Sequence, residues 1–158
     1  MSKPDKKSVS ASSKRLSLSS GKALTVFSEI LVKISRLTDL KTTLDEVLLI
    51  LKKVCGCRHL AIRIIDENGR IPFFAQLGLS DAFIKSEHWI TLDDCLCGHV
   101  ARGGVDTTRP NFTEHGSFYS NDLHVFMQNA RCGKEGISED NLRGFCSDHG
   151  YASVAIIP

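Results

Sequence analysis

The sequence has no continuous apolar run of about 18 residues, the length that a membrane-spanning helix needs. The basic N-terminus also lacks the apolar core of a secretory signal, because serine and lysine stand where that core would lie. These two absences favour a cytoplasmic protein without membrane insertion. In that compartment we expect the six cysteines to be thiols and not a framework of disulfides.

Signatures of common enzymes are absent as well. No glycine-rich phosphate loop is present, because "ARGGV" has neither a lysine nor the strand and helix that such a loop joins. Ser117 stands in "HGSFY", which is not the Gly-x-Ser-x-Gly turn of hydrolases. Asp93 and Asp94 have no carboxylate partner at a recognisable spacing, and capping of a helix suits them equally well. We therefore expect no catalytic constellation in this chain.

Aromatic residues are sparse, at 7%, and the body of the chain has no basic patch interleaved with them, which argues against a nucleic-acid interface. Positive charge is concentrated in residues 1–22, where lysine and arginine far outnumber a single aspartate. This segment is rich in serine and nearly free of large apolar side chains, so it cannot bury enough surface to offset the entropy of ordering. We predict that residues 1–22 form a disordered basic tail.

Two helices are predicted to open the folded part. The chain is 42% hydrophobic, which suffices for one domain with a buried core. Apolar residues recur at helical spacing from residue 23 to about residue 37, which predicts the first helix. A second helix is predicted to start at Thr43, in "TLDE", where Glu46 completes a capping box. Gly56 is suited to end it in the left-handed conformation.

The pattern then changes to the alternation of strands. Residues 59–65 and 70–78 are predicted to pair as a hairpin across the turn at Asn68-Gly69. These elements describe an α+β fold with a central antiparallel sheet and flanking helices. The remaining predicted elements are a helix at 80–87, a strand at 88–92, a helix in "CGHVARGG" that ends at Gly103-Gly104, a helix at 121–130 and a buried strand at 151–158.

These elements form one predicted domain, residues 23–158. Its last segment, "YASVAIIP", has the pattern of an inner strand, which normally has a neighbour on each side. We therefore expect this domain to lack its last strand and the helix that follows. The open edge would make the chain on its own associate or dissolve poorly.

Potential metal-ligating and reactive side chains are concentrated in "DDCLCGHV", where Cys95 and Cys97 flank one leucine. One intervening residue is fewer than structural zinc sites prefer, and the haem-attachment run Cys-x-x-Cys-His is absent. A metal would therefore need further ligands, with Cys146 the first choice, Cys132 the second and His99 another candidate. Such ligands suit zinc, an iron–sulfur cluster or haem iron. Buried inert thiols and redox-active thiols remain open as alternatives.

We predict that Cys95, Cys97 and Cys146 converge in one pocket. The turn after "HWITL" and the loop before "YASVAII" both lie at ends of predicted strands, which antiparallel neighbours bring together. His115 and His149 each adjoin a glycine in the loops near these cysteines. They are therefore the histidines that we consider as additional ligands.

The order of these motifs resembles that of GAF domains. The run from "LVKISRLTDL" to "DENGRI" resembles their opening helices and first strand, and "GYASVAIIP" resembles their penultimate strand. "CLCG", "GSFYSN" and the segment from Cys146 through "GYASVAIIP" are similar to a narrower GAF subgroup, attached to bacterial and archaeal sensor histidine kinases. Its patterns are Cys-x-Cys-Gly, Gly-Ser-Phe-x-x-Asn and Cys before Gly-Tyr-x-Ser-Val-Ala-x-Ile-Pro. Tyr119 and Ser120 depart from the middle motif.

The resemblance implies a sensory and regulatory module in signal transduction. Such a module would bind a small molecule, a metal or a haem cofactor, or sense redox state, and act on an output domain such as a histidine kinase in another domain or chain. The middle segment contains the expected ligand-binding residues, which are Ser117, Tyr119 and Asn121, with His115 beside them. The first helix is expected to join two copies as a homodimer. The alternative is a dimerisation or interaction scaffold without a ligand.

Overall fold

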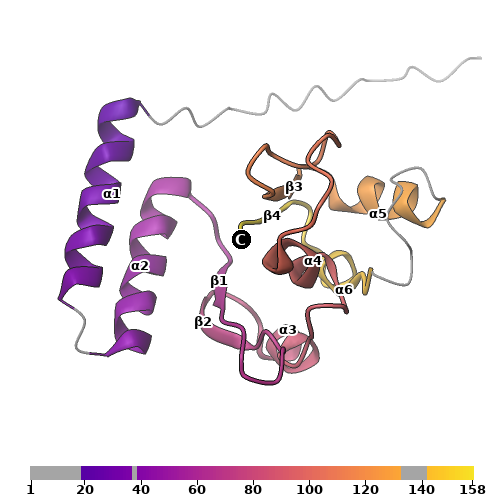
Figure 1. The fold of residues 1–158 in the computed structure, drawn as a ribbon, viewed down its shortest axis with the longest axis horizontal. Coiled ribbons are helices and arrows are strands. Elements are labelled where there is room, and N and C mark those ends of the chain that lie inside the picture. The colour runs from indigo at the N-terminus through magenta and orange to yellow at the C-terminus, as the bar shows by residue number, and fades with distance from the viewer. Residues whose placement is uncertain (1–18, 37–38, 133–141) are drawn as a thin grey trace, which may run out of the picture.

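The computed structural model describes residues 19–36, 39–132 and 142–158. Within these residues helices and short antiparallel strands are combined, so the α+β class is confirmed (Figure 1). The sequence predicted a disordered tail at residues 1–22, and residues 1–18 of it lie outside the described residues. Its last three residues already belong to the first helix.

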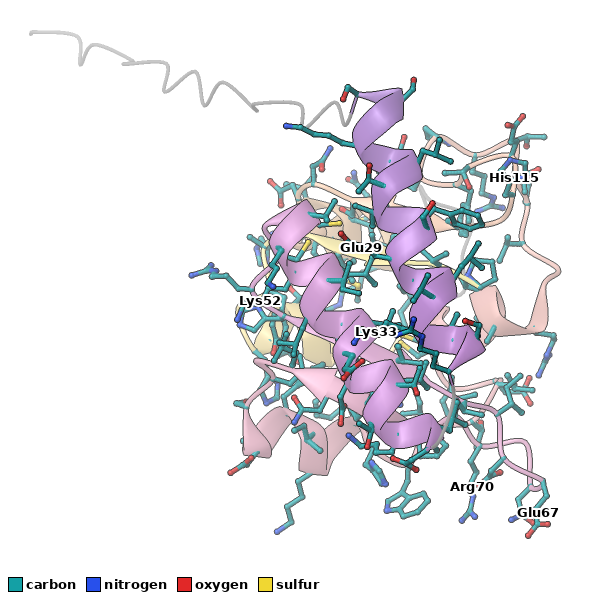
Figure 2. All side chains as sticks on the ribbon, turned by 90° about the vertical axis from the view of Figure 1, so that its left-hand side faces the viewer. Glu29, Lys33, Lys52, Glu67, Arg70 and His115 are labelled. Carbon is teal, nitrogen blue, oxygen red and sulfur yellow. The ribbon has the colours of Figure 1, made fainter. Side chains whose placement is uncertain are left out.

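Two long helices pack side by side. α1 (Ser20–Ser35) begins earlier than the sequence pattern predicted, and α2 (Leu40–Cys55) follows it. Lys33 of α1 pairs with Glu46 of α2 across 2.7 Å, and Figure 2 shows Lys33 at the junction of the two helices. None of the residues of α1 is buried. α1 therefore rests on α2 through one face only.

The start of α2 corrects the prediction at Thr43. The helix begins at Leu40, and its N-cap is Asp39, whose carboxylate accepts a hydrogen bond from the backbone N–H of Thr42 at 2.8 Å. Thr43 lies inside the first turn, with its hydroxyl bonded to the Asp39 carbonyl. Aspartate is a better N-cap than threonine, and here it occupies the earlier position. The predicted end is confirmed, because Gly56 caps α2 with a φ of 65°.

The predicted hairpin is confirmed, with shorter strands. β1 (Leu60–Arg63) pairs antiparallel with β2 (Phe73–Leu77), and Gly69 adopts a φ of 72° in the turn. The register shifts between Ile62 and Arg63, which is a β-bulge or a similar irregularity. α2 packs against both strands of this small sheet.

Two further predicted helices, at 80–87 and 121–130, are present in the structure. α3 (Asp81–Glu87) is capped by Ser80, whose hydroxyl accepts from the backbone N–H of Phe83 at 3.2 Å. α5 (Leu123–Arg131) lies within one or two residues of its predicted range, and the carboxylate of Asp122 caps it in the same way.

The strand predicted at 88–92 is wrong. Thr91 forms only an isolated bridge with Arg70, and the N–H of Ile71 donates to the carbonyl of Ile90 at 2.8 Å. The segment therefore touches the far end of the hairpin without extending its sheet. In this segment Ile90 is completely buried, while its neighbour Trp89 is exposed.

The helix predicted in "CGHVARGG" is α4 (Leu96–Arg102), which ends at Gly103 as predicted. Gly98 of this helix packs directly on the backbone before it. A Cβ atom at Gly98 would lie 2.3 Å from the carbonyl oxygen of Leu92, closer than real contacts allow. The glycine of "CLCG" therefore has a steric role in seating α4.

A second small sheet joins the C-terminal segment to the loop region. β3 (Phe118–Ser120) pairs antiparallel with β4 (Val154–Ile156). The described residues thus contain two separate two-stranded sheets, where the sequence predicted one central sheet. The buried strand predicted at 151–158 is also corrected, because β4 covers three residues, is half-buried at best, and is followed by the exposed Ile157.

The core that supports the candidate site lies between α4, α5 and the second sheet. Phe118 of β3 is completely buried and packs edge-on against Phe112 and Phe126. The short helix α6 (Phe145–Asp148) lies beside α5. Figure 1 shows α1 and α2 at one end of the molecule, the hairpin next to them, and α4, α5 and α6 toward the other end. The buried residues of this cluster are Leu96, Val100, Phe112, Phe118, Leu123, Phe126 and Met127.

Candidate thiol site

Three cysteines meet at one small cavity. Cys95 is the N-cap of α4, Cys97 lies in the first turn of the same helix, and Cys146 belongs to α6. All three line a cavity of about 30 Å³. The structure brings these side chains together from two distant segments, as the hypothesis of a shared pocket requires. We call Cys95, Cys97 and Cys146 the cavity cysteines.

The rest of the cavity wall is almost entirely apolar. Glu87, at the end of α3, is the charged residue among those that line it. An apolar wall strengthens electrostatic interactions, because little water is present to screen them. The other lining residues are Leu96, Leu123, Met127, Leu142, Gly144, Phe145, Ser147, Val154 and Ile156.

Arg63 of β1 provides a positive charge beside the cavity cysteines. Arg63 pairs with Phe73 of β2, directly after the register shift in this hairpin. The guanidinium donates to the backbone carbonyls of Ile71 and Glu87, and it stacks on Phe73 at 3.6 Å from the ring centroid. Burial lowers the pKa of Arg63, and the charges of the cavity cysteines and Glu87 oppose that effect. Arginine stays protonated in either case.

Glu87 is held by a second arginine. Arg143 donates from Nε to Oε1 of Glu87 at 3.1 Å, and from Nη2 to the carbonyl of Ser86 at 3.3 Å. A carboxylate as deeply buried as Glu87 requires such a partner, because an unpaired buried charge is costly. The pair joins the end of α3 to the segment that leads into α6.

The hydrogen bond between Cys95 and Cys97 determines which of the two is ionised. This bond lowers the pKa of Cys95 to about 6, although burial acts in the opposite direction. The same bond raises the pKa of Cys97 well above its ordinary value, because Cys97 keeps the proton that it donates. Near neutral pH, Cys95 is therefore the thiolate and Cys97 the donor.

Cys146 remains a thiol under the same conditions. Burial raises its pKa to about 12, and the negative charges of Cys95 and Glu87 act in the same direction. The cavity therefore contains one thiolate and two protonated thiols. That combination suits chemistry in which one sulfur attacks and another supplies a proton.

The cavity does not fit the cofactors that the sequence suggested. No group of three or more His, Cys, Asp or Glu side chains is arranged to hold a metal ion anywhere in residues 19–36, 39–132 and 142–158. The cavity of about 30 Å³ is also far smaller than the roughly 300–1,000 Å³ of pockets that hold drug-sized ligands. As the side chains stand, neither zinc, an iron–sulfur cluster nor haem fits among the cavity cysteines.

Two of the predicted ligand-binding residues have local structural partners. Ser117 is half-buried, and its backbone N–H donates to the Thr113 hydroxyl while its carbonyl accepts from the Thr113 N–H. Tyr119 is exposed, and its hydroxyl donates to the carbonyl of Pro110 at 3.0 Å. These contacts hold the loop against β3, and neither residue lines the cavity of the cysteines.

The other two predicted ligand-binding residues lie on the surface. Asn121 is exposed directly after β3. His115 is exposed, lies 3.3 Å from the carboxylate of Glu114, and stands at the margin of the molecule in Figure 2. The structure therefore does not bring either residue to the cavity cysteines.

The remaining candidate ligands also lie apart from the cavity. Cys132 is exposed just after α5. His99 is in α4, and its Nε2 is buried without a hydrogen-bond partner among the described residues. His149 is exposed, with its ring edge-on to Phe83 and its Nδ1 3.0 Å from the carbonyl of Phe145. None of these three residues lines the cavity.

Sequence reasoning missed the charged residues of the site. Arg63 had a visible signal, because it is a lone charge in the apolar alternation "HLAIRII". Glu87 had none, since its sequence position is that of an ordinary helix end. Its partner Arg143 is 56 positions away, a separation that local patterns do not reveal.

A wider, open hollow lies along α3. Trp89, at its edge, is exposed, and the guanidinium of Arg70 lies over its ring at 4.9 Å from the centroid. None of the predicted site residues lines this hollow. It has a volume of about 390 Å³ and is lined by Asp81, Ile84, Lys85, His88 and Trp89.

Comparison with protein-family models, curated proteins and solved structures finds no match to this chain. The resemblance to GAF domains therefore rests on the quoted motifs alone. In the described part of the chain, no helix has both the length and the apolar character that crossing a membrane demands.

Proposed function

We propose that the chain is a sensory module of the GAF type that responds to the redox state of its cavity cysteines and regulates an output domain such as a histidine kinase. The convergence of Cys95, Cys97 and Cys146 on one small cavity carries this proposal. A cluster with a purely structural role has no need of an ionised sulfur, whereas Cys95 is held as a thiolate. A cytoplasmic location, where thiols stay reduced until an oxidant arrives, suits this function.

The signal would pass through Arg63. This arginine interacts with the charge of the cavity cysteines, and it belongs to β1, on which α2 packs. Oxidation of the Cys95 thiolate removes one of the negative charges with which the guanidinium interacts and so weakens that attraction. The position of β1 under α2, and hence of α1 beside α2, would then shift between two populations.

The output surface would be the exposed face of α1. We call Leu24, Phe27, Leu31 and Ile34 the α1 stripe. All four are exposed, and their spacing of three, four and three residues is that of a two-stranded coiled coil. The half-buried Val26 is not part of the stripe and the half-buried Ile30 borders it, so the four residues of the stripe remain free for a partner.

A second copy of this chain is the partner that the stripe fits. The positions flanking it in a coiled coil are occupied by Ala23, Ser28, Ile30 and Ser35, all uncharged. Two parallel copies would therefore bring no like charges together at their edges. The charged Lys33 is already paired with Glu46 of α2.

Equilibration of the full chain in glutathione buffers of graded redox potential tests the proposal. Mass spectrometry of the intact protein would follow the intramolecular disulfide, and sedimentation would follow the dimer fraction at each potential. We expect a disulfide among the cavity cysteines to form and the dimer equilibrium to shift with the same midpoint. A dimer fraction that is the same in the fully reduced and oxidised proteins would contradict redox sensing.

A dimerisation scaffold is the second candidate, and the α1 stripe favours it. Such a scaffold would dimerise through α1 irrespective of the state of the thiols. The glutathione experiment separates the two functions, because a stable dimer without redox response is the result expected of a scaffold.

Binding of a cofactor through the cysteines stays a prediction from the sequence. Metal analysis and an absorption spectrum of the purified protein test it directly. Stoichiometric zinc or iron, or a haem band, that disappears in Cys97→Ala would replace redox sensing by cofactor binding. Metal-free, colourless protein is the result expected of the proposed function.

A further inference from the structure

We propose that Cys95 is the sulfur that a small hydroperoxide oxidises and that Cys146 resolves the product as a Cys95–Cys146 disulfide. This inference rests on the proposed function and specifies its oxidant and its order of events. Three observations about the cavity support it: the arrangement of the three thiols, the charge of Arg63 and the cavity volume.

The arrangement gives each cysteine a different part. Cys97 donates a hydrogen bond to Cys95 and so stabilises the thiolate, which is the nucleophilic form of the residue. Cys146 lies on another element, α6, and lines the same cavity. Cys97 is thus a positioning residue, and Cys146 is the thiol placed to attack from a separate helix.

In the first step the Cys95 thiolate attacks one oxygen of hydrogen peroxide. An S–O bond forms and the O–O bond breaks, so the sulfur loses two electrons and the peroxide is reduced. The products are the Cys95 sulfenic acid and hydroxide, which takes a proton from solvent to become water. The guanidinium of Arg63 lies near the cavity cysteines, where it favours the charge on the leaving oxygen.

In the second step the sulfur of Cys146 attacks the sulfur of the Cys95 sulfenic acid. The S–S bond forms, the S–O bond breaks, and the hydroxyl leaves with the proton of Cys146 as water. The thiolate charge of Cys95 is one of the causes that raise the pKa of Cys146. Because the first step removes that charge, it makes Cys146 easier to ionise, and the two steps follow in a fixed order.

The cavity volume selects the oxidant. A cavity of roughly 10–15 Å³ holds one water molecule. The observed volume of about 30 Å³ therefore matches an oxidant with two heavy atoms. Hydrogen peroxide has that size, whereas an aromatic hydroperoxide such as cumene hydroperoxide does not fit between the apolar walls.

The experiment uses the full chain with the exposed Cys55, Cys57 and Cys132 replaced by serine, so that only the cavity cysteines remain. The reduced protein is treated with hydrogen peroxide, with and without dimedone, and its peptides are mapped by mass spectrometry. We expect a disulfide that links the peptides of Cys95 and Cys146. In Cys146→Ser we expect a dimedone adduct on Cys95 instead, and in Cys95→Ser neither product.

A bulkier oxidant tests whether the cavity selects by size. We expect cumene hydroperoxide to oxidise folded protein several-fold more slowly than hydrogen peroxide, relative to the rates of the two oxidants on the urea-unfolded chain. Equal relative rates in the folded protein would overturn the assignment of a small oxidant. A Cys95–Cys97 disulfide would overturn the role of Cys146, and a first adduct on Cys146 would overturn that of Cys95.

Failure of this inference is distinguishable from failure of the proposed function. A disulfide that forms in glutathione buffer but not with hydrogen peroxide leaves redox sensing in place and overturns the peroxide route. Absence of a disulfide under both conditions overturns both. Peptide mapping of the protein that keeps all three cavity cysteines identifies the disulfide without any change at Cys95 or Cys146. The test therefore stands even if the Cys95→Ser or Cys146→Ser variant fails to fold.

Discussion

Arg143 donates a hydrogen bond from Nε to Oε1 of Glu87 across 3.1 Å, and this contact ties the segment before α6 to the end of α3. Glu87 is only 3% exposed, whereas the side chain of Arg143 remains partly in contact with solvent. Both residues adjoin the cavity cysteines, since Glu87 lines the cavity and Gly144 follows Arg143 in its wall. The ion pair therefore joins α3, whose last residue lines the cavity, to the segment that leads into α6 and Cys146.

Replacement of Arg143 by methionine is expected to destabilise the fold. The change leaves the carboxylate of Glu87 buried without its charged partner, which costs about 3 kcal/mol in comparable pairs. Urea unfolding followed by circular dichroism measures the loss. The matched control is Arg102→Met, which removes the exposed partner of Asp93 and should cost less than about 1 kcal/mol. Equal losses in the two variants would contradict a buried pair.

Gly98→Ala is expected to destabilise α4 and the thiol site with it. The new Cβ would clash with the backbone of Leu92, which cannot move aside as a flexible side chain could. Overpacking of this kind costs about 1–3 kcal/mol. Gly104→Ala is the control, because a Cβ there meets open space. Thermal unfolding of both variants checks the prediction, and a Gly98→Ala variant as stable as the control would refute the close packing.

Local features of the fold could be predicted from the sequence because their causes are local. Ser80 caps α3 as predicted, and Gly56 and Gly103 end their helices in the left-handed conformation. The hairpin also follows from its own turn residues. Thr43 shows the limit of such reasoning, since two acceptable caps stood close together and the stronger one, Asp39, determines the start of α2.

Features that depend on distant partners could not be predicted. A strand was predicted at 88–92, yet the burial of this segment reflects contact with the hairpin turn and not membership of a sheet. The convergence of Cys95 and Cys146 was a hypothesis from strand ends, and the actual elements there are helices α4 and α6. The sequence contains no pattern that predicts the Glu87–Arg143 ion pair, because ion pairs between distant segments have no fixed spacing.

The thiolate of Cys95 is expected to be lost as the pH falls through about 6, the pKa that its hydrogen bond with Cys97 sets. The difference in ultraviolet thiolate absorbance between the protein and Cys95→Ser measures this titration without any reagent. Because this pKa lies below the ordinary value of 9.0, the bond stabilises the fold fully above about pH 9. That contribution declines as the pH falls toward 6.

Two variants at Cys97 separate its hydrogen bond from its volume. Cys97→Ser keeps a donor and should leave the midpoint of the Cys95 titration low, whereas Cys97→Ala removes the donor and should raise it toward 9.0. The same midpoint in both variants would show that Cys97 does not hold the thiolate.

Leu31→Asp in the α1 stripe is expected to weaken the proposed homodimer. A buried coiled-coil position does not tolerate an unpaired carboxylate, so we expect the dissociation constant to rise at least about tenfold, equivalent to 1.4 kcal/mol. The change leaves the monomer fold intact, because no residue of α1 is buried in it. Leu49→Asp on α2 is a matched control, since Leu49 is 49% exposed and Leu31 48%. Sedimentation equilibrium over a range of concentrations gives both constants. Equal weakening by the two substitutions would show that the association depends on general apolar exposure, and a dimer unaffected by Leu31→Asp would place the interface away from α1.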